Sequence, residues 1–379
     1  MRICFVNDDF LTGGVQKSVS EVGQELSKSY IVYYYQFSQD ENKVNLPKQF
    51  LFSERATTID KNLFYRKIKK YSEYLFTRQY NYTSFNKYRI RELSNFLKKK
   101  EIDLVILNQG NSAALIPELK KSYSKPKYIT WMHSNFDVYV NNYYRRFSKS
   151  FIQGLKYSDA VVCLTNHDVL EIQKINTKVF QIDNPNPLKE VSISSLSQKK
   201  ISFVSRINFF IKGFDFLFEI ARNIPESWVI SIAGAGSQDE KEDLIDQISE
   251  KGLMNKIDFV GELNSSQLVN FYVESSIFLS TSRWEGFGVS IVEAMSCGLP
   301  IVCFENEGPK EILKNGKYGV LIEKYDLKSM LIELDKLMKS IDLRREYQNL
   351  SLVRSRDFQL GVVKEKWLSV INSIVGEKN

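Results

Sequence analysis

Two glutamates on either side of a glycine turn form the most informative pattern of this chain. Glu285 is followed by the turn Gly286–Gly288, and Glu293 stands eight positions after Glu285, among helix-forming residues that begin at about Val289. Glycine lets a ligand approach the backbone closely, and the free N–H groups of a first helical turn attract phosphate. A carboxylate about one turn further in can accept hydrogen bonds from a diol such as ribose. The spacing therefore predicts a nucleotide-sugar site, with Glu285 facing another part of the same ligand.

Ordinary α/β structure offers an alternative explanation of the same residues. Many α/β proteins have the same succession of elements where no ligand binds: a turn, an amphipathic helix, a helix end at Cys297-Gly298 and a strand at Ile301–Phe304. Spacing alone leaves both explanations open, so residues elsewhere in the chain have to decide between them.

Two cations follow a predicted strand in the middle of the chain. Arg206 and Lys212 come after Ile201–Ser205. A guanidinium and an ammonium at that place can stabilise the negative charge that grows on a diphosphate as its bond to a sugar breaks. Two solvated surface cations are the alternative.

Glycines and one histidine also follow predicted strands. Gly13-Gly14 open the first predicted helix, where a backbone without side chains can approach phosphate or sugar, although such pairs also form plain turns. Gly234 and Gly236 follow another strand, and loop geometry alone can account for them. His133 ends the strand Tyr128–Met132, and it is either a ligand contact or a core residue.

The segment from Glu285 to Glu293 resembles the E-x7-E signature of the retaining glycosyltransferases of family 4, whose two glutamates flank a Gly-Phe-Gly turn. Further landmarks of that family occur in the same order and together span about nine-tenths of this chain. They are Gly13-Gly14, Arg206, Lys212-Gly213, Gly234, Gly236, Gly308-Pro309, Glu311, Gly316 and Gly319.

The resemblance implies a GT-B fold, in which two Rossmann-like domains face one another across a cleft and the last helix returns to the N-terminal domain. It implies substitution on the same face of the sugar, with the leaving phosphate accepting the proton of the acceptor and no assigned protein nucleophile. The catalytic residues that it implies are Arg206, Lys212, Glu285 and His133. The implied donor-binding residues are Gly13, Gly14, Arg206, Lys212, Gly234, Gly236, Val260, Glu262, Glu285, Gly286, Phe287, Gly288, Val289 and Glu293.

Length and composition are those of a two-domain globular protein. The chain has 379 residues, of which 43% are hydrophobic and 26% charged. No apolar run approaches the ~18 residues of a membrane span, and the start at Met1–Val6 is predicted to be a buried strand rather than a signal peptide. The four cysteines lack metal-ligand spacing, so we expect reduced core thiols in a cytoplasmic protein, with no cofactor and no metal.

Apolar runs alternate with amphipathic stretches along the whole chain, which predicts an α/β protein of two doubly wound parallel sheets. The Asn184–Pro187 segment and the polar stretch after it predict a linker. With the domain roles and the return helix that the resemblance implies, we expect an acceptor-binding domain at 1–187, joined by a return helix at 358–379, and a nucleotide-sugar domain at 188–357. The predicted strands are Arg2–Asn7, Ile31–Phe37, Leu104–Asn108, Tyr128–Met132, Ala160–Leu164, Val179–Ile182, Ile201–Ser205, Trp228–Ala233, Ile257–Val260, Ile277–Ser280 and Ile301–Phe304.

Positive charge is concentrated in the N-terminal half. The net charge is +7, and the stretch 61–100 holds twelve basic residues against two acidic ones, interleaved with aromatic residues. Such a stretch suits adsorption to anionic lipid at the inner face of the plasma membrane. Helices with aromatic core faces and solvated lysines are the alternative, and no recognition module indicates nucleic acid.

The expected activity is transfer of a hexose or N-acetylhexosamine from a nucleotide sugar, foremost a UDP-sugar, to a saccharide or lipid-linked acceptor of a bacterial envelope glycan. Two alternatives remain. A catalytically silent adaptor of a partner transferase would be expected to lack the charged site residues, and a UDP-N-acetylglucosamine epimerase would need acid and base groups, for which only His133 is an evident candidate. A dinucleotide enzyme is disfavoured, because the first loop lacks the G-x-G-x-x-G fingerprint.

Overall fold

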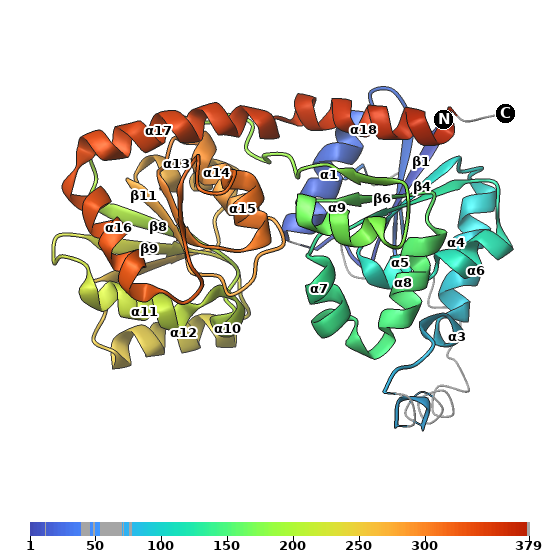
Figure 1. The fold of residues 1–379 in the computed structure, drawn as a ribbon, viewed down its shortest axis with the longest axis horizontal. Helices are drawn as coiled ribbons and strands as arrows, with labels where there is room; N and C mark the ends of the chain where they lie inside the picture. Colours follow the sequence, from blue (N-terminus) through green and yellow to red (C-terminus); the bar gives the residue numbers. More distant parts are fainter. Residues whose placement is uncertain are drawn as a thin grey trace. The chain divides into compact units, whose positions relative to one another are not determined.

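The computed structural model describes residues 1–11, 13–38, 46–47, 50–53, 70, 72–75 and 78–376. The chain forms two compact units (Figure 1). Unit 1 comprises Met1–Pro185 with Leu360–Asn379, and unit 2 comprises Asn186–Gln359. Each unit is built around one parallel sheet, which confirms the predicted α/β class.

The sheet of unit 1 has seven parallel strands in the order β3-β2-β1-β4-β5-β6-β7. Side chains of alternate residues along β1 enter two separate cores, as strands covered on both faces require. Ile3 and Phe5 lie in one core, and Cys4 and Val6 lie in the other. The strands are β1 Arg2–Asn7, β2 Ile31–Gln36, β3 Leu51–Ser53, β4 Leu104–Asn108, β5 Lys127–Trp131, β6 Ala160–Cys163 and β7 Val179–Gln181.

Helices cover both faces of this sheet. Apolar residues of α1 and α18 fill one core, and those of α4, α6 and α8 fill the other. The helices are α1 Gly14–Leu26, α3 Tyr82–Phe85, α4 Lys87–Lys99, α5 Gly110–Ala113, α6 Ile116–Ser122, α7 Phe136–Val138, α8 Ser148–Tyr157, α9 Asn166–Gln173 and α18 Leu360–Val375, with short η2 Tyr139–Tyr143 and η3 Arg145–Phe147.

The sheet of unit 2 has six parallel strands in the order β10-β9-β8-β11-β12-β13. Its main core lies between the sheet and the helices α11, α12 and α16, while α14 contacts β11, β12 and α17. The strands are β8 Lys200–Val204, β9 Val229–Ala233, β10 Ile257–Gly261, β11 Ile277–Ser280, β12 Ile301–Phe304 and β13 Val320–Ile322. The helices are α10 Phe209–Lys212, α11 Phe214–Asn223, α12 Gln238–Glu250, α13 Ser265–Val273, α14 Val289–Ser296, α15 Glu307–Leu313, α16 Leu327–Lys339, α17 Ile341–Ser355 and the short η4 Arg356–Phe358.

Every predicted strand is present, with ends that differ by at most one residue. The sequence patterns missed β3 and β13. Both have three residues and both lie at a sheet edge, and three residues are too few to establish an alternation of apolar and polar positions.

The C-terminal helix α18 belongs to unit 1, which confirms the predicted return of the last helix to the N-terminal part of the chain. It contacts α1, and Trp367 is fully buried against Trp131 of β5, with ring centroids 4.8 Å apart in an edge-to-face arrangement. Aromatic pairs of this geometry add to the free energy of burial. The last helix is therefore an integral part of the core of unit 1.

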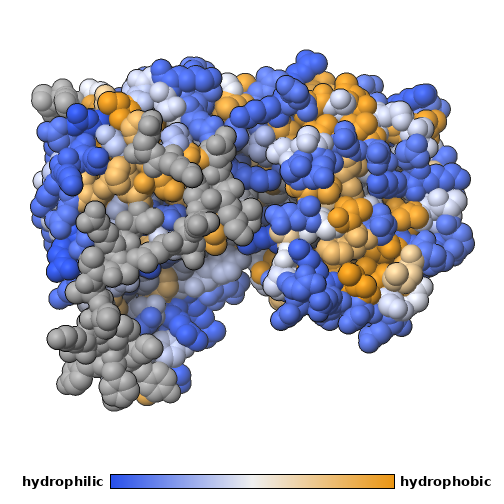
Figure 2. All heavy atoms as spheres, turned by 180° about the vertical axis from the view of Figure 1, so that it is seen from behind, coloured by the Kyte–Doolittle hydropathy of each residue, from blue (hydrophilic) through white to orange (hydrophobic). Residues whose placement is uncertain are grey.

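No helix in the described part of the chain is long and apolar enough to cross a membrane. On the face drawn in Figure 2, hydrophilic side chains are interspersed with smaller apolar groups.

Replacing Trp367 tests how strongly α18 stabilises unit 1. Trp367→Ala should lower the free energy of unfolding by about 3–5 kcal/mol, because it removes a large buried side chain and leaves a cavity beside Trp131. Val362→Ala on the same helix should have little effect, because Val362 is 41% exposed. Chemical denaturation followed by tryptophan fluorescence measures both variants. Equal stability of the two would contradict a core role for α18.

Candidate functional site

Three of the predicted charged residues of unit 2 follow the strands between which the strand order of its sheet reverses. Strands β9 and β10 lie on one side of β8, and β11 to β13 lie on the other. The connections after β8 and β11 therefore lead away from each other, and ligands of such sheets bind beside the carboxyl ends of these two strands. Arg206 and Lys212 follow β8, and Glu285 follows β11.

Lys212 and Glu285 form a close ion pair at this position. The Lys212 Nζ lies 2.6 Å from the Glu285 Oε2, and the Ser282 Oγ lies 3.4 Å from the same oxygen. The two charged side chains are 18% and 22% exposed. A half-buried ion pair stays accessible to solvent and to a ligand. Its reduced hydration strengthens its electrostatic interaction with nearby charges.

Gly213 brings the α10 segment onto the end of β11. The Thr281 Oγ1 donates hydrogen bonds to the carbonyl oxygens of Lys212 and Gly213, at 2.9 and 3.0 Å. Gly213 has φ +67°, and a Cβ at this residue would lie 2.1 Å from the Thr281 carbonyl oxygen. Only glycine fits such an approach, so the Lys-Gly pair places the Lys212 backbone against the strand that precedes Glu285.

Arg283 joins the same two segments on their outer side. Its guanidinium makes two bonds of 2.8 and 2.6 Å to the Asp215 carboxylate and donates to the Phe210 carbonyl oxygen at 2.8 Å. It also lies over the rings of Phe210 and Phe216. The hydrogen bond from Arg283 lowers the pKa of Asp215. Sequence reasoning missed this clamp, since no local spacing relates positions 215 and 283.

The second glutamate of the motif lies inside α14 as predicted. Gly288 precedes the helix with φ +108°, and Glu293 is only 4% exposed. The Tyr272 Oη of α13 donates a hydrogen bond of 3.0 Å to the Glu293 Oε2. Burial and the adjacent charge of Glu293 raise the pKa of Tyr272 well above its ordinary range, so the phenol stays protonated and donates. Tyr272 is a further residue that the sequence did not reveal.

The glycine turn before α14 is held by the connection that follows β12. Phe287 is buried, and a Cβ on Gly308 would lie 2.3 Å from the Phe287 carbonyl oxygen. The Asn306 Nδ2 donates to the Ser282 carbonyl oxygen at 2.8 Å. Gly308 is therefore required for close packing of α15 on the turn, which gives a structural reason for the Gly-Pro landmark.

The glycines after β9 allow three connections to lie together. A Cβ on Gly234 would lie 1.7 Å from the Ser205 carbonyl oxygen, and the Gly234 N–H donates to the Gly261 carbonyl oxygen at 2.8 Å. Ile207 N–H donates to the Ala235 carbonyl oxygen, also at 2.8 Å. The ends of β8, β9 and β10 are thus in direct contact.

Exposed residues surround these contacts. Arg206, Val260 and Glu262 are exposed, and Gly236 would bring a Cβ to 2.9 Å from the Ile207 side chain. The contacts of this region join Lys212 to Glu285, whereas Glu293 bonds to Tyr272 instead. The roles of Arg206, Val260, Glu262, Gly234 and Gly236 toward a nucleotide stay predictions.

Gly13, Gly14 and His133 belong to unit 1. Gly13 precedes α1, and Gly14 is its first residue. His133 is buried, and its Nε2 lies 3.1 Å from the Asn108 Oδ1. Burial lowers the pKa of His133 to about 3, so the imidazole is neutral at physiological pH. The Nδ1 atom has no hydrogen-bond partner within the described ranges.

In the described residues, no group of three or more His, Cys, Asp or Glu side chains is arranged to hold a metal ion. The four cysteines are buried as free thiols. Burial raises the pKa of Cys297 to about 12, which keeps that thiol protonated.

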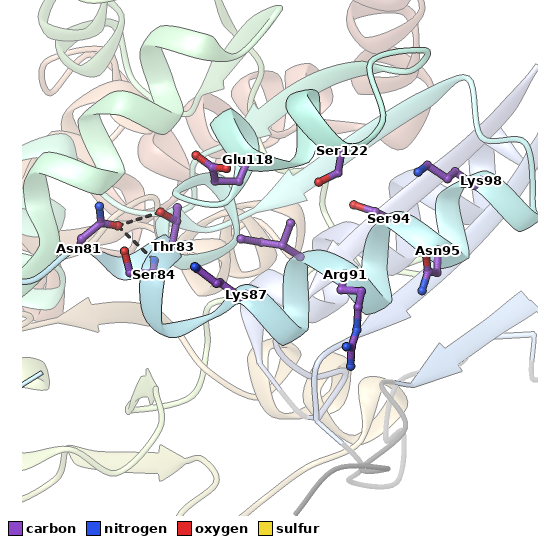
Figure 3. Close-up of a pocket in the computed structure, with 11 residues that line it drawn as sticks. Asn81, Thr83, Ser84, Lys87, Arg91, Ser94, Asn95, Lys98, Glu118 and Ser122 are labelled. Atoms are coloured by element: carbon purple, nitrogen blue, oxygen red, sulfur yellow. Dashed lines mark hydrogen bonds between the residues drawn. The ribbon is translucent and has the colours of Figure 1, made fainter. Parts of the chain in front are cut away.

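A separate open groove of about 630 Å³ lies in unit 1 beside α3, α4 and α6. Figure 3 shows its side chains, with the hydroxyls of Ser94 and Ser122 turned toward the space between α4 and α6. None of the predicted site residues lines it. The lining residues are Asn81, Thr83, Ser84, Lys87, Ile90, Arg91, Ser94, Asn95, Lys98, Glu118 and Ser122.

Residues 187–350 match the family described as "Glycosyl transferases group 1", a range that covers most of unit 2. Similar curated proteins include an uncharacterized glycosyltransferase of Haemophilus influenzae, 28% identical over 74% of this chain and 79% of the relative. The amylovoran biosynthesis glycosyltransferase AmsD of Erwinia amylovora is 24% identical over 76% of this chain and 83% of the relative.

Solved structures share the fold of nearly the whole chain. A sucrose-phosphate synthase from Thermosynechococcus elongatus has a TM-score of 0.80 and 14% identity, over 99% of each chain. The Anabaena protein HepE in complex with UDP-glucose has a TM-score of 0.76 and 16% identity, over 98% of this chain and 100% of its own. These likenesses confirm the expected GT-B fold of two Rossmann-like domains.

The low pKa of His133 makes the stability of this protein depend on pH. The unfolded chain binds a proton at His133 near the ordinary pKa of 6.5, but the folded chain does so only near 3. The contribution of the neutral His133 to the free energy of unfolding is therefore fully present above pH 6.5. It is lost as the pH falls toward 3. Between pH 7 and pH 5, His133→Gln should lose about 2 kcal/mol less unfolding free energy than the wild type. Urea denaturation at both pH values measures the difference, and equal losses would contradict a buried neutral imidazole.

Proposed function

We propose that this protein is a retaining glycosyltransferase that works without a metal ion. It transfers a hexose or N-acetylhexosamine from a nucleotide sugar, foremost a UDP-sugar, to a saccharide or lipid-linked acceptor of a bacterial envelope glycan.

The observation that carries this proposal is the Lys212–Glu285 pair at the reversal of the strand order in unit 2. A cation and a carboxylate 2.6 Å apart, both partly exposed, provide opposite charges for two parts of one ligand. The ammonium suits a diphosphate, and the carboxylate suits the hydroxyls of the sugar attached to it. The first turn of α14, with no acidic residue, adds N–H donors and a positive partial charge for phosphate.

In the proposed reaction, the bond from the anomeric carbon to the diphosphate oxygen breaks, and a bond to the acceptor oxygen forms on the same face. The acceptor proton passes to the leaving phosphate. Lys212 and Arg206 stabilise the charge that develops on that phosphate, and Glu285 orients the sugar. Glu293 accepts hydrogen bonds from the ribose hydroxyls, and the neutral His133 contacts the sugar.

The proposed substrates are supported by what similar proteins are known to bind or to make. HepE has been crystallised with UDP-glucose, and AmsD is a glycosyltransferase of amylovoran biosynthesis. A protein of Campylobacter jejuni that is 22% identical over 99% of this chain acts on an undecaprenol-linked oligosaccharide. An adaptor without catalysis would not need the Lys212–Glu285 pair, and an epimerase would need acid and base groups beyond a histidine that stays neutral.

Nucleotide binding tests the donor site directly. UDP, GDP, ADP and their sugars are titrated calorimetrically into the protein in EDTA, with sugar release followed in parallel. We expect selective binding and slow hydrolysis of one UDP-sugar. Glu293→Gln, which retains an oxygen for Tyr272, should weaken UDP binding by about 1–3 kcal/mol if the charged carboxylate bonds to ribose.

The control for this variant is Glu250→Gln, at an exposed glutamate of α12, which should bind UDP as the wild type does. Unchanged affinity in Glu293→Gln would overturn the ribose assignment. Lack of a response to every nucleotide sugar would overturn the proposed function itself.

We also propose that the basic stretch at 61–100 contacts an anionic membrane surface. Part of it, at 61–69, 71 and 76–77, lies outside the described residues. Tyr80, Tyr82 and Phe85 are buried in the core of unit 1, as the helical alternative predicts for them. The proposal therefore rests on charge, since Lys87, Arg91 and Lys98 line one groove (Figure 3). The Glu118 carboxylate of this groove is bonded to Lys121.

Sedimentation with phosphatidylglycerol vesicles tests this contact. Binding should be strong at low salt and fade as salt is added, because the interaction is between exposed charges. Exchange of Lys87, Arg91 and Lys98 for glutamate should abolish binding, whereas the same exchange at Lys251, Lys324 and Lys328 of unit 2 should not. No sedimentation at low salt would refute the membrane contact.

A further inference from the structure

The sheet of unit 1 also reverses its strand order, and a second polar cluster lies at that reversal. Strands β2 and β3 lie on one side of β1, and β4 to β7 lie on the other. Asp8 follows β1, and Gln109 and Asn111 follow β4. These positions correspond to those of Lys212 and Glu285 in unit 2, where ligands of doubly wound sheets bind.

Side chains from three segments meet in this cluster. The Asn111 Nδ2 donates a hydrogen bond to the Asp8 Oδ2, and the Arg89 Nη1 of α4 lies 3.5 Å from the Asp8 Oδ1. The side chains of Asp8 and Arg89 remain 34% and 23% exposed, so both can still reach a ligand. Arg89 also lies over the Phe37 ring, 4.8 Å from its centroid.

Polar atoms at the same edge of the sheet lack hydrogen bonds. Asn7, the last residue of β1, is 3% exposed, and its Oδ1 has no partner in the described structure. The same holds for the Asn111 Oδ1 and the His133 Nδ1. His133 is joined to β1 through Asn108, whose Nδ2 donates to the Val6 carbonyl oxygen at 3.2 Å. Buried polar atoms without partners are costly, so within the described residues this edge of the sheet carries polar groups that its own contacts leave unsatisfied.

The backbone at this edge is strained. Gln109 has φ +70°, which is rare for a residue other than glycine, and its N–H donates to the Trp131 carbonyl oxygen at 3.1 Å. The next residue, Gly110, donates its N–H to the Tyr144 Oη at 3.1 Å. The surrounding contacts thus hold Gln109 in an unfavourable conformation, as occurs at ligand sites.

From this cluster we infer that Asp8, Asn111 and Arg89 recognise the acceptor, and that the part they bind is an uncharged saccharide with neighbouring hydroxyl groups. A carboxylate accepts hydrogen bonds from hydroxyls, a guanidinium donates to their oxygens, and an amide does both. Asp8 and Arg89 together carry no net charge. The negative Asp8 carboxylate would repel a phosphate group bound at the same place. This assignment rests on the proposed transferase function, whose charged donor groups Arg206, Lys212, Glu285 and Glu293 belong to unit 2.

Kinetics with defined glycosides test the assignment. The acceptor probes are methyl hexosides and methyl N-acetylhexosaminides, each compared with its 6-phosphate, at a saturating concentration of the UDP-sugar that the protein hydrolyses. The wild type should transfer to at least one uncharged glycoside. Asp8→Asn and Asn111→Ala should each raise the KM for that glycoside about 10-fold or more, from loss of hydrogen bonds to the ligand.

Donor hydrolysis without acceptor separates this assignment from the proposed function. Both variants should hydrolyse the UDP-sugar at a rate within about twofold of the wild type, since no donor contact is changed, and this also shows that they are folded. Asp137→Asn, at an exposed carboxylate of unit 1, should leave the acceptor KM unchanged.

Three results would overturn the acceptor assignment: an unchanged KM in both variants, transfer to the phosphorylated glycosides alone, or transfer to no glycoside of the panel. Loss of donor hydrolysis in the two variants would overturn it as well, because the cluster would then serve the donor. A wild type that hydrolyses no nucleotide sugar would instead refute the proposed function.

Discussion

The reversal of strand order in each parallel sheet is the constraint on which both polar clusters depend. Successive strands are added on one side of β8 and then on the other, so the connections after β8 and β11 diverge at the carboxyl edge. That divergence brings Lys212 and Glu285 into contact although 73 positions separate them. In unit 1 the same topology joins Asp8 to Asn111 across 103 positions.

In unit 2, close backbone contacts at the carboxyl edge of the sheet determine which residues certain positions can accept. Gly213, Gly234 and Gly308 each lie where an added Cβ would approach a carbonyl oxygen to 2.3 Å or less. Because a carbonyl on an adjacent segment cannot withdraw as a flexible side chain can, these positions accept only glycine. The glycines are therefore required for packing between the connections.

Burial decides the charge state of the groups around the two clusters. His133 and Tyr272 are both buried, so one stays neutral at physiological pH and the other stays protonated. Lys212 and Glu285 keep partial exposure and a partner of opposite charge. The chain thus combines a partly exposed ion pair with buried groups that stay neutral.

Local sequence determined the elements and the types of the site residues. Apolar runs gave eleven of the thirteen strands in the described part of the chain, and the helix-forming residues after Gly288 gave the start of α14. The edge strands β3 and β13 were missed, because three residues are too few to form a recognisable pattern of apolar positions. Tertiary structure alone decided the partners: Tyr272 for Glu293, Asp215 for Arg283, Asn306 for the Ser282 carbonyl, and Asn111 with Arg89 for Asp8. Such contacts join residues on different strands and helices, and no spacing along the chain encodes them, since their geometry is set by the order in which the strands assemble.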